Sequence, residues 1–145
     1  MPAIKVQVVI NSNENKIFAL IRNMEGFPKF MCHVKVIEIL ERMPDRIISE
    51  WKVDIDGAPI EWQEEDIFDE KNMTCKFRTI KGDYQYSGVW KLEEIEKNKT
   101  KVSISVNFDW EMPNFEKFIG YLLERKARNS LRSMLNAIKK EAELG

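Results

Sequence analysis

The stretch PIEWQEEDIF, residues 59–68, decides how the rest of the chain is read, because it places acidic side chains inside a strand-like pattern. Side chains alternate between the two faces of a strand, so one face would carry Ile60, Trp62, Glu64, Asp66 and Phe68. Burying an unpaired carboxylate is costly in free energy. Either this segment is not a strand, or its inner face borders a cavity where acids are solvated, paired or used.

Length and charge narrow the class of protein. The 145 residues fit one domain spanning residues 1–145, large enough for a core without metals or disulfides. Because 23 Lys and Arg nearly balance 24 Asp and Glu, no global field attracts DNA or anionic lipid. Cys32 and Cys75 form no CxxC pair, which is typical of free thiols in a reducing compartment. Without a signal-like start or a run of ~20 apolar residues, we expect a cytoplasmic protein with no membrane segment.

The N-terminal region predicts a strand followed by two short helices. Residues 4–10 alternate between apolar and polar side chains, as a half-buried strand does. Ser12 or Asn13 could cap a helix whose apolar residues recur at helical spacing as far as Met24, before Gly26 and Pro28 end it. A second short helix or turn is expected around residues 27–31.

Residues 33–111 predict six strands in an antiparallel meander, because short turn signals separate them. Val36 and Ile37 are adjacent apolar residues, and this change of parity predicts a bulge in the first of these strands. Gly88 lacks a side chain, which would let a ligand or a helix approach closely. Parity gathers the aromatic residues on one face of the sheet: Trp51, Trp62, Phe77, Tyr84, Tyr86, Trp90 and Phe108.

The segment from Pro113 to about Glu143 predicts one long helix. At 1.5 Å per residue it would reach ~45 Å, about the diameter of the domain, so it must lie across the sheet. Its apolar stripe changes direction along the helix, which predicts a bend or a separate first turn near Gly120.

This order of elements resembles the helix-grip fold of the START-like superfamily. The similarity is to the branch that contains polyketide cyclase/dehydrase proteins, coenzyme Q-binding proteins and ribosome-association toxins. It implies an α+β fold, in which an antiparallel sheet of about seven strands wraps around a long C-terminal helix, with a deep cavity between them. The matching stretches are EGFPKF (25–30), SEWKV (49–53), IEW (60–62), GDYQYSGVW (82–90), TKVSISVNFDW (100–110) and MLNAIKKEAE (134–143).

The implied cavity would explain the acids of residues 59–68, because they would face it and need no permanent partner. Its expected ligand is a hydrophobic, partly oxygenated small molecule such as a lipid, quinone, prenyl compound or polyketide. The simpler alternative is that the aromatic face is an ordinary core under a helix. The expected lining is Trp51, Trp62, Glu64, Asp66, Phe77, Tyr84, Tyr86, Trp90 and Phe108 from the sheet, with Ile119, Leu122, Leu123 and Lys126 from the helix.

A second hypothesis is an enzyme of the polyketide cyclase/aromatase type. Its candidate proton carriers are Glu64, Asp66, Tyr84 and Tyr86. Similar cyclases place an arginine in the pocket, whereas parity sends Arg78 to the outer face of the sheet. Alternatively, Glu64 and Asp66 reach water near a strand end or pair with Lys126.

A third hypothesis concerns the long helix, where Arg125, Arg128, Arg132 and Lys139 form a basic stripe opposite the apolar one. Such a stripe is usually a solvated face, and the alternative is contact with a ribosome, an acidic protein or anionic lipid.

The chain shows no pattern for a cofactor or a metal. His33, the single histidine, is adjacent to Cys32, and neighbouring strand residues point to opposite faces, so a Cys-His catalytic pair is not expected. Its simplest place is a turn or a strand end. There is no glycine-rich phosphate loop, no hydrolase-type serine elbow and no cluster of metal ligands.

Overall fold

A computed structural model of the protein describes residues 3–55, 57–82, 85–108 and 117–144; the side chains of residues 55, 58, 108 and 117–123 are outside this description. The order of elements is the predicted one. The N-terminal strand β1 (Ala3–Ile10) leads into the helix α1 (Glu14–Arg22) and the 3-10 helix η1 (Met24–Lys29). The remaining elements are β2 (Val34–Arg42), β3 (Arg46–Ile55), β4 (Ala58–Asp69), β5 (Thr74–Gly82), β6 (Tyr86–Glu96), β7 (Lys99–Phe108) and α2 (Lys117–Glu143).

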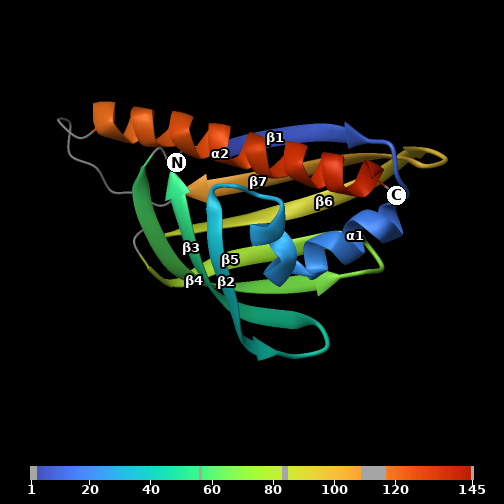
Figure 1. The fold of residues 1–145 in the computed structure, drawn as a ribbon, viewed down its shortest axis with the longest axis horizontal. Helices are drawn as coiled ribbons and strands as arrows, with labels where there is room; N and C mark the ends of the chain where they lie inside the picture. The colour runs from blue at the N-terminus through green and yellow to red at the C-terminus, as the bar shows by residue number, and fades with distance from the viewer. Residues whose placement is uncertain (1–2, 56, 83–84, 109–116, 145) are drawn as a thin grey trace.

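The seven strands form one antiparallel sheet in the order β1-β7-β6-β5-β4-β3-β2, which confirms the predicted meander with β1 added beside β7. Figure 1 shows the sheet curving around the helices, with α2 running along β1 and α1 lying over the same side of the sheet. The core therefore lies between the inner face of the sheet and these helices. No helix among the described residues is long and apolar enough to cross a membrane.

The two short helices lie close to their predicted places. Asn13 rather than Ser12 caps α1 through its side chain, because Asn13 Oδ1 accepts a hydrogen bond of 2.8 Å from the backbone N–H of Lys16. The second helix occupies residues 24–29 instead of 27–31, so the predicted bounds were a few residues late. Met24 and Phe27 of η1 are buried against the sheet.

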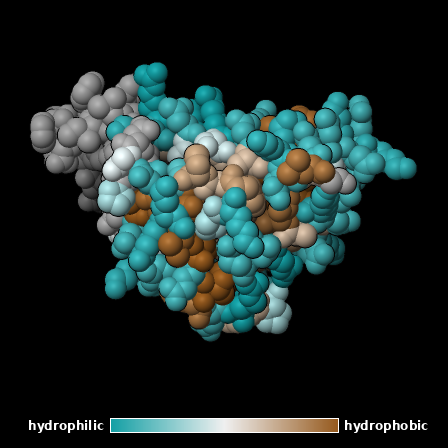
Figure 2. Space-filling model, viewed as in Figure 1, coloured by the Kyte–Doolittle hydropathy of each residue, from teal (hydrophilic) through white to brown (hydrophobic). Residues whose placement is uncertain are grey.

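The strand β2 is irregular, as its sequence predicted. Its pairing with β3 shifts between Val34 and Val36 and again between Ile39 and Glu41. The first shift confirms the bulge, and it moves burial from Val34 to Ile37. β2 is an edge strand, and its residues Val36 and Leu40 are exposed. Figure 2 shows apolar side chains among the polar ones on this face of the molecule. Bulges of this kind disrupt edge-to-edge pairing with another sheet.

The strand β4 is present, and its inner face carries the residues predicted for it. Ile60, Glu64, Asp66 and Phe68 are buried there. The outer face is less exposed than parity suggested, since Glu65 is buried as well. Glu65 is covered from its own side, where Arg46 and Arg78 each donate a hydrogen bond of 3.0 Å to its carboxylate. Arg78 thus lies on the outer face, as predicted.

The basic stripe of α2 is only partly solvated. Arg128 donates to the backbone oxygen of Lys5 at 3.4 Å, and Lys139 donates to that of Val9 at 2.8 Å. These two side chains occupy carbonyls of the edge strand β1, while Arg125 and Arg132 are exposed. The prediction that the whole stripe is solvated was therefore wrong for Arg128 and Lys139.

The helix α2 is continuous across Gly120, so the predicted separate first turn is not present there.

Candidate functional site

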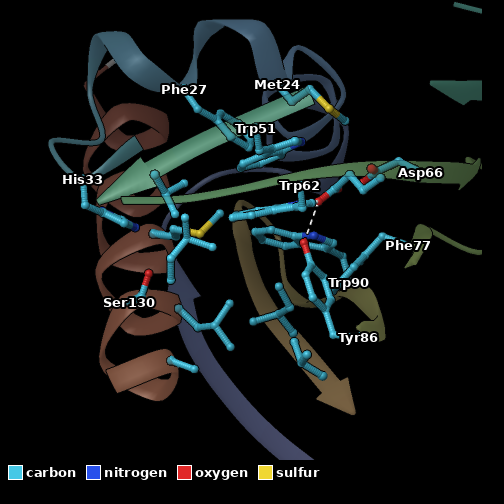
Figure 3. Close-up of a pocket in the computed structure, with 18 of the residues that line it drawn as sticks. Met24, Phe27, His33, Trp51, Trp62, Asp66, Phe77, Tyr86, Trp90 and Ser130 are labelled. Carbon is cyan, nitrogen blue, oxygen red and sulfur yellow. Dashed lines mark hydrogen bonds between the residues drawn. The ribbon is translucent and has the colours of Figure 1, made fainter. Parts of the chain in front are cut away.

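A cavity of about 130 Å³ lies between the inner face of the sheet and α2, and Figure 3 shows the side chains that surround it. Eight of the expected lining residues are there: Trp51, Trp62, Glu64, Asp66, Phe77, Tyr86, Trp90 and Lys126. Tyr84 and the side chains of Phe108, Ile119, Leu122 and Leu123 lie outside the described residues, so their roles stay predictions.

The sequence reasoning missed other lining residues. Ile21, Met24 and Phe27 reach the cavity from α1 and η1, and Ala127, Ser130, Leu131 and Met134 reach it from α2. Val53, Ile60, Ile104 and Val106 complete the sheet side, and their strand parity was a signal that could have found them. Nothing in the sequence shows where α1 and η1 dock, whereas the apolar stripe of α2 was a signal that could have found Ala127, Leu131 and Met134.

Aromatic rings form one wall of the cavity. The rings of Trp51 and Trp62 are stacked, with centroids 5.5 Å apart and planes 15° apart. Tyr86 meets the edge of Trp62 at 5.8 Å, and Phe77 meets Tyr86 at 5.7 Å. Pairs of this geometry fix one another's orientation, so the wall is a rigid surface on which a flat apolar molecule could lie.

The carboxylate of Glu64 is the centre of a polar cluster within this apolar surface. Trp62 Nε1 donates to Glu64 Oε1 at 2.7 Å, and the Tyr86 hydroxyl donates to the same oxygen at 2.8 Å. Glu64 and Asp66 are 4% and 3% exposed, so neither acid reaches water at a strand end. Burial and the nearby Glu64 carboxylate raise the pKa of Tyr86 well above its usual range, so Tyr86 remains a phenol that donates to Glu64.

Asp66 is the most perturbed acid of the cluster. Burial, followed by the negative charge of Glu64, raises the pKa of Asp66 well above its usual range. Its Oδ2 accepts a hydrogen bond of 3.5 Å from the Cys75 thiol, and a side-chain hydrogen bond with Glu64 also raises the pKa of Asp66. Burial also raises the pKa of Cys75, followed by the charge of Asp66, so Cys75 remains a thiol rather than a nucleophilic thiolate.

Lys126 lines the cavity as expected but is not the ionic partner of the acids, and Gly88 makes room for other groups than those expected. Lys126 lines the cavity but is exposed, and within the described part of the chain it makes no ion pair with Glu64 or Asp66. The space beside Gly88 is taken by other parts of the sheet. A Cβ atom at Gly88 would lie 2.5 Å from the ring of Phe77 and 2.3 Å from the backbone oxygen of Ser105, so the glycine accommodates Phe77 and β7.

His33 lies in the turn before β2, as predicted, but it also lines the cavity. Burial, followed by the charge of Lys35, lowers the pKa of His33, which favours the neutral imidazole. Its Nε2 is buried and has no hydrogen-bond partner. Cys32 is exposed, so the two neighbours form no catalytic pair.

Within the described ranges, no group of three or more His, Cys, Asp or Glu side chains could hold a metal ion.

The sequence of this chain is similar to a known family, and its fold is similar to several solved structures. Residues 13–135 match the family described as polyketide cyclase/dehydrase and lipid transport. No curated protein matches the sequence.

Several solved structures share the fold at low sequence identity. A protein of Thermus thermophilus is 22% identical, with a TM-score of 0.90 over 98% of this chain and 97% of that one. The Zhui aromatase/cyclase of a Streptomyces species is 16% identical, with a TM-score of 0.90 over 98% and 93%. A START superfamily protein of Mycobacterium smegmatis is 13% identical, with a TM-score of 0.80 over 97% of each chain. These similarities confirm the helix-grip fold, and a fold alone does not fix a function.

Proposed function

Because this chain belongs to the polyketide cyclase/dehydrase and lipid transport family, we propose that it binds an apolar, partly oxygenated small molecule between the sheet and α2. The observation that carries the proposal is the cavity itself, whose lining is mostly apolar and aromatic with a small polar cluster. Sites for small molecules have this composition, since apolar walls supply affinity and a few polar groups fix orientation.

The size of the cavity favours a ring-shaped ligand or head group. Its volume of about 130 Å³ is close to that of an engineered apolar cavity, ~150 Å³, that binds benzene. A quinone ring or an aromatic polyketide would suit this space better than a whole lipid chain. The stacked indoles of Trp51 and Trp62 would contact the ring, while Glu64, Asp66 and Tyr86 would orient its oxygen atoms. Tyr84, Phe108, Ile119, Leu122 and Leu123 are proposed to extend the lining.

Tryptophan fluorescence tests this proposal, because Trp51, Trp62 and Trp90 all line the cavity. Titration with a panel of quinones, aromatic polyketides, prenyl alcohols and fatty acids should give a saturable change for at least one class. The matched variants Trp62→Phe and Trp90→Phe should each reduce the amplitude of that change. A flat response across the whole panel, in a protein that is shown to be folded, would contradict binding.

The polar cluster favours a second candidate function, which is acid-base catalysis of a polyketide cyclisation. Its specific support is that a buried acid with a raised pKa, Asp66, lies beside the acceptor Glu64. In this hypothesis Glu64 accepts a proton from a carbon between two carbonyl groups, and protonated Asp66 donates one to a carbonyl oxygen. The resulting enol would then attack a second carbonyl of the same molecule and close a ring, while its O–H proton returns to Asp66 and Glu64 gives its proton to the new alkoxide.

Turnover of a poly-β-keto substrate tests the second candidate. Glu64→Gln should abolish ring closure, because the amide cannot accept the carbon-bound proton, and Glu94→Gln is the control at an exposed carboxylate. The expected loss is at least a hundredfold, the usual contribution of a positioned acid or base, about 10²–10⁴. Absence of turnover with every such substrate, together with tight binding of the same molecules, would leave binding as the only function.

A further inference from the structure

The side chains of Glu64 and Asp66 form a pair that must hold a proton between them. They occupy alternate positions on the inner face of β4, both are buried, and a side-chain hydrogen bond joins them. A carboxylate offers only acceptors, so two carboxylates cannot bond to each other unless one of them is protonated. Among the described residues neither acid belongs to an ion pair, so no cation replaces this proton. Neighbouring buried acids of this kind share one proton.

The hydrogen bonds around the pair are unevenly divided between the two acids. Glu64 Oε1 accepts from Trp62 Nε1 at 2.7 Å and from the Tyr86 hydroxyl at 2.8 Å. Apart from its bond with Glu64, Asp66 accepts among the described side chains from the Cys75 thiol alone, at 3.5 Å, and a thiol is a weak donor. Hydrogen bonds to a charged form stabilise that form, so this division favours the negative charge on Glu64 and the proton on Asp66.

The two donors to Glu64 are held in place by the aromatic wall of the cavity (Figure 3). The ring of Trp62 stacks on Trp51 at 5.5 Å, and the ring of Tyr86 makes T-shaped contacts of 5.8 Å with Trp62 and 5.7 Å with Phe77. An indole N–H can only donate, so Trp62 cannot turn into an acceptor for a protonated Glu64. The wall thus aims fixed donors at one acid of the pair.

No other titratable or charged group near the pair makes a comparable distinction. Such groups are Cys75 on β5, Arg22 on α1, Glu65 on the outer face of β4, Lys126 on α2 and His33 before β2. Arg22 donates to the backbone oxygen of Pro44 at 2.6 Å, and Glu65 is paired with arginines on its own face of the sheet. Lys126 is exposed, and within the described ranges neither it nor His33 donates to the acids. Trp62 and Tyr86 are therefore the side chains that distinguish Glu64 from Asp66.

We propose that Trp62 and Tyr86 are positioning residues of the acid pair: by donating to Glu64 they keep the shared proton on Asp66. Glu64 is then the carboxylate that accepts a proton from a ligand, and Asp66 is the acid that donates one. This inference rests on the acid-base candidate of the proposed function, and it names the groups that assign the two roles. Without these donors the proton could lie on either acid, and the pair would contain no fixed base.

Carbon-13 nuclear magnetic resonance of the side-chain carboxyl groups tests the proposal in the native protein without any ligand. Labelled Asp and Glu supply the signals, and Asp66→Asn and Glu64→Gln assign them. Near pH 6, about two units above the ordinary pKa of a carboxyl group, the Glu64 carbon should have the shift of a carboxylate and the Asp66 carbon that of a carboxylic acid. The opposite arrangement, or carboxylate shifts for both carbons, would overturn the proposal.

Tyr86→Phe tests the positioning role itself, since it removes the hydroxyl and keeps the ring. Loss of a hydrogen bond to a charged group should raise the lower titration midpoint of the pair by about one pH unit or more. Trp62→Phe should act in the same direction. Ser130→Ala is the matched control, because it removes a cavity hydroxyl that donates to neither acid among the described residues, and it should leave the midpoint unchanged.

The outcomes separate this inference from the proposed function. If the midpoint rises in Tyr86→Phe and a poly-β-keto substrate turns over, the acidic limb of the pH–rate profile should move by the same amount. If the midpoint rises but no substrate turns over, the placement of the proton stands and the acid-base function fails. If Tyr86→Phe titrates like Ser130→Ala while ligands bind or react, the positioning role is wrong and the proposed function stands.

Discussion

Asp66 is a carboxyl group that the fold buries without a cationic partner, and it is held beside a second carboxylate. Both conditions disfavour its charged form, and both act only in the folded state. A structural acid would normally be paired with a cation, as Glu65 is with Arg46 and Arg78 on the other face of the same strand. The contrast between Glu65 and Asp66 is consistent with the proposed role of Asp66 in the cavity, because a buried acid without a cation does not add stability.

The raised pKa of Asp66 predicts how stability changes with pH. Between the unfolded pKa of about 4 and the higher folded pKa, the folded state binds the proton more tightly. The free energy of unfolding should therefore fall as pH rises through this window, by at most about 1.4 kcal/mol per pH unit. Asp66→Asn should remove this part of the slope and be more stable than the native protein at pH above the window.

Urea unfolding at a series of pH values measures this effect. Glu94→Gln removes an exposed carboxylate and should keep the native slope. Parallel curves for Asp66→Asn and the native protein would contradict the assignment of a raised pKa to Asp66.

The close packing around Gly88 predicts that a larger side chain at this position lowers stability. Gly88→Ala should lower the free energy of unfolding by about 1–3 kcal/mol, because the added Cβ would overlap the Phe77 ring and the Ser105 carbonyl. Gly26→Ala is the matched control, since its Cβ would meet nothing closer than 3.4 Å, and its effect should stay within about 0.5 kcal/mol. If thermal unfolding gives the same loss of stability for Gly88→Ala and Gly26→Ala, the predicted overlap at Gly88 is contradicted.

At the scale of elements, α2 is attached to the sheet through β1 as well as through its apolar face. The carbonyl groups of Lys5 and Val9 lie on the edge strand of the sheet, and Arg128 and Lys139 donate to them. These contacts cover one free edge of the sheet, while β2 carries bulges at the other edge. Both edges are thus protected against pairing with a second sheet.

Lys139→Met tests the attachment of α2 to β1. It should lower the free energy of unfolding by about 0.5–1 kcal/mol, because the hydrogen bond to Val9 and the ion pair with Glu143 are both lost. Arg132→Met removes an exposed cation of the same helix and should change stability by less than about 0.5 kcal/mol. A larger loss for Arg132→Met than for Lys139→Met in urea unfolding would contradict this account.

Much of the sheet could be predicted from sequence, because parity and turn residues are local signals. The period of two placed Trp62, Glu64 and Asp66 on one face of β4, and the adjacent apolar pair in β2 indicated its bulge. The same signals could not place Arg128 and Lys139, since a helical stripe shows only which side chains share a direction. Which neighbour they meet depends on the position of α2 along β1, which the sequence of α2 does not encode locally.

At the scale of the whole molecule, the cavity is a region that the fold leaves unfilled at the junction of α1, η1, α2 and the sheet. The sequence predicted its existence from the acids on an otherwise apolar strand face and from resemblance to a family. His33 was missed as a lining residue because its turn conformation says nothing about the direction of its side chain. Glu64 and Asp66 were found because buried acids conflict with an apolar face, which is visible in the sequence itself.

Filling the cavity should raise stability and reduce binding. Ala127 lines the cavity from α2, so Ala127→Leu should add apolar contacts and raise the free energy of unfolding by about 1–2 kcal/mol. The same substitution should weaken any ligand at least tenfold. Asn136→Leu places the same side chain on an exposed position of α2 and should change neither quantity appreciably. Loss of stability in Ala127→Leu with unchanged binding would show that the space is not the binding site.

The most direct test of the central claim is native mass spectrometry of the protein purified from its own host, beside Ala127→Leu prepared in the same way. The account predicts that the native protein carries one apolar, oxygenated molecule per chain, identifiable after solvent extraction, and that Ala127→Leu carries much less. Identical masses without any bound molecule in both proteins, with no binding across the ligand panel, would contradict it.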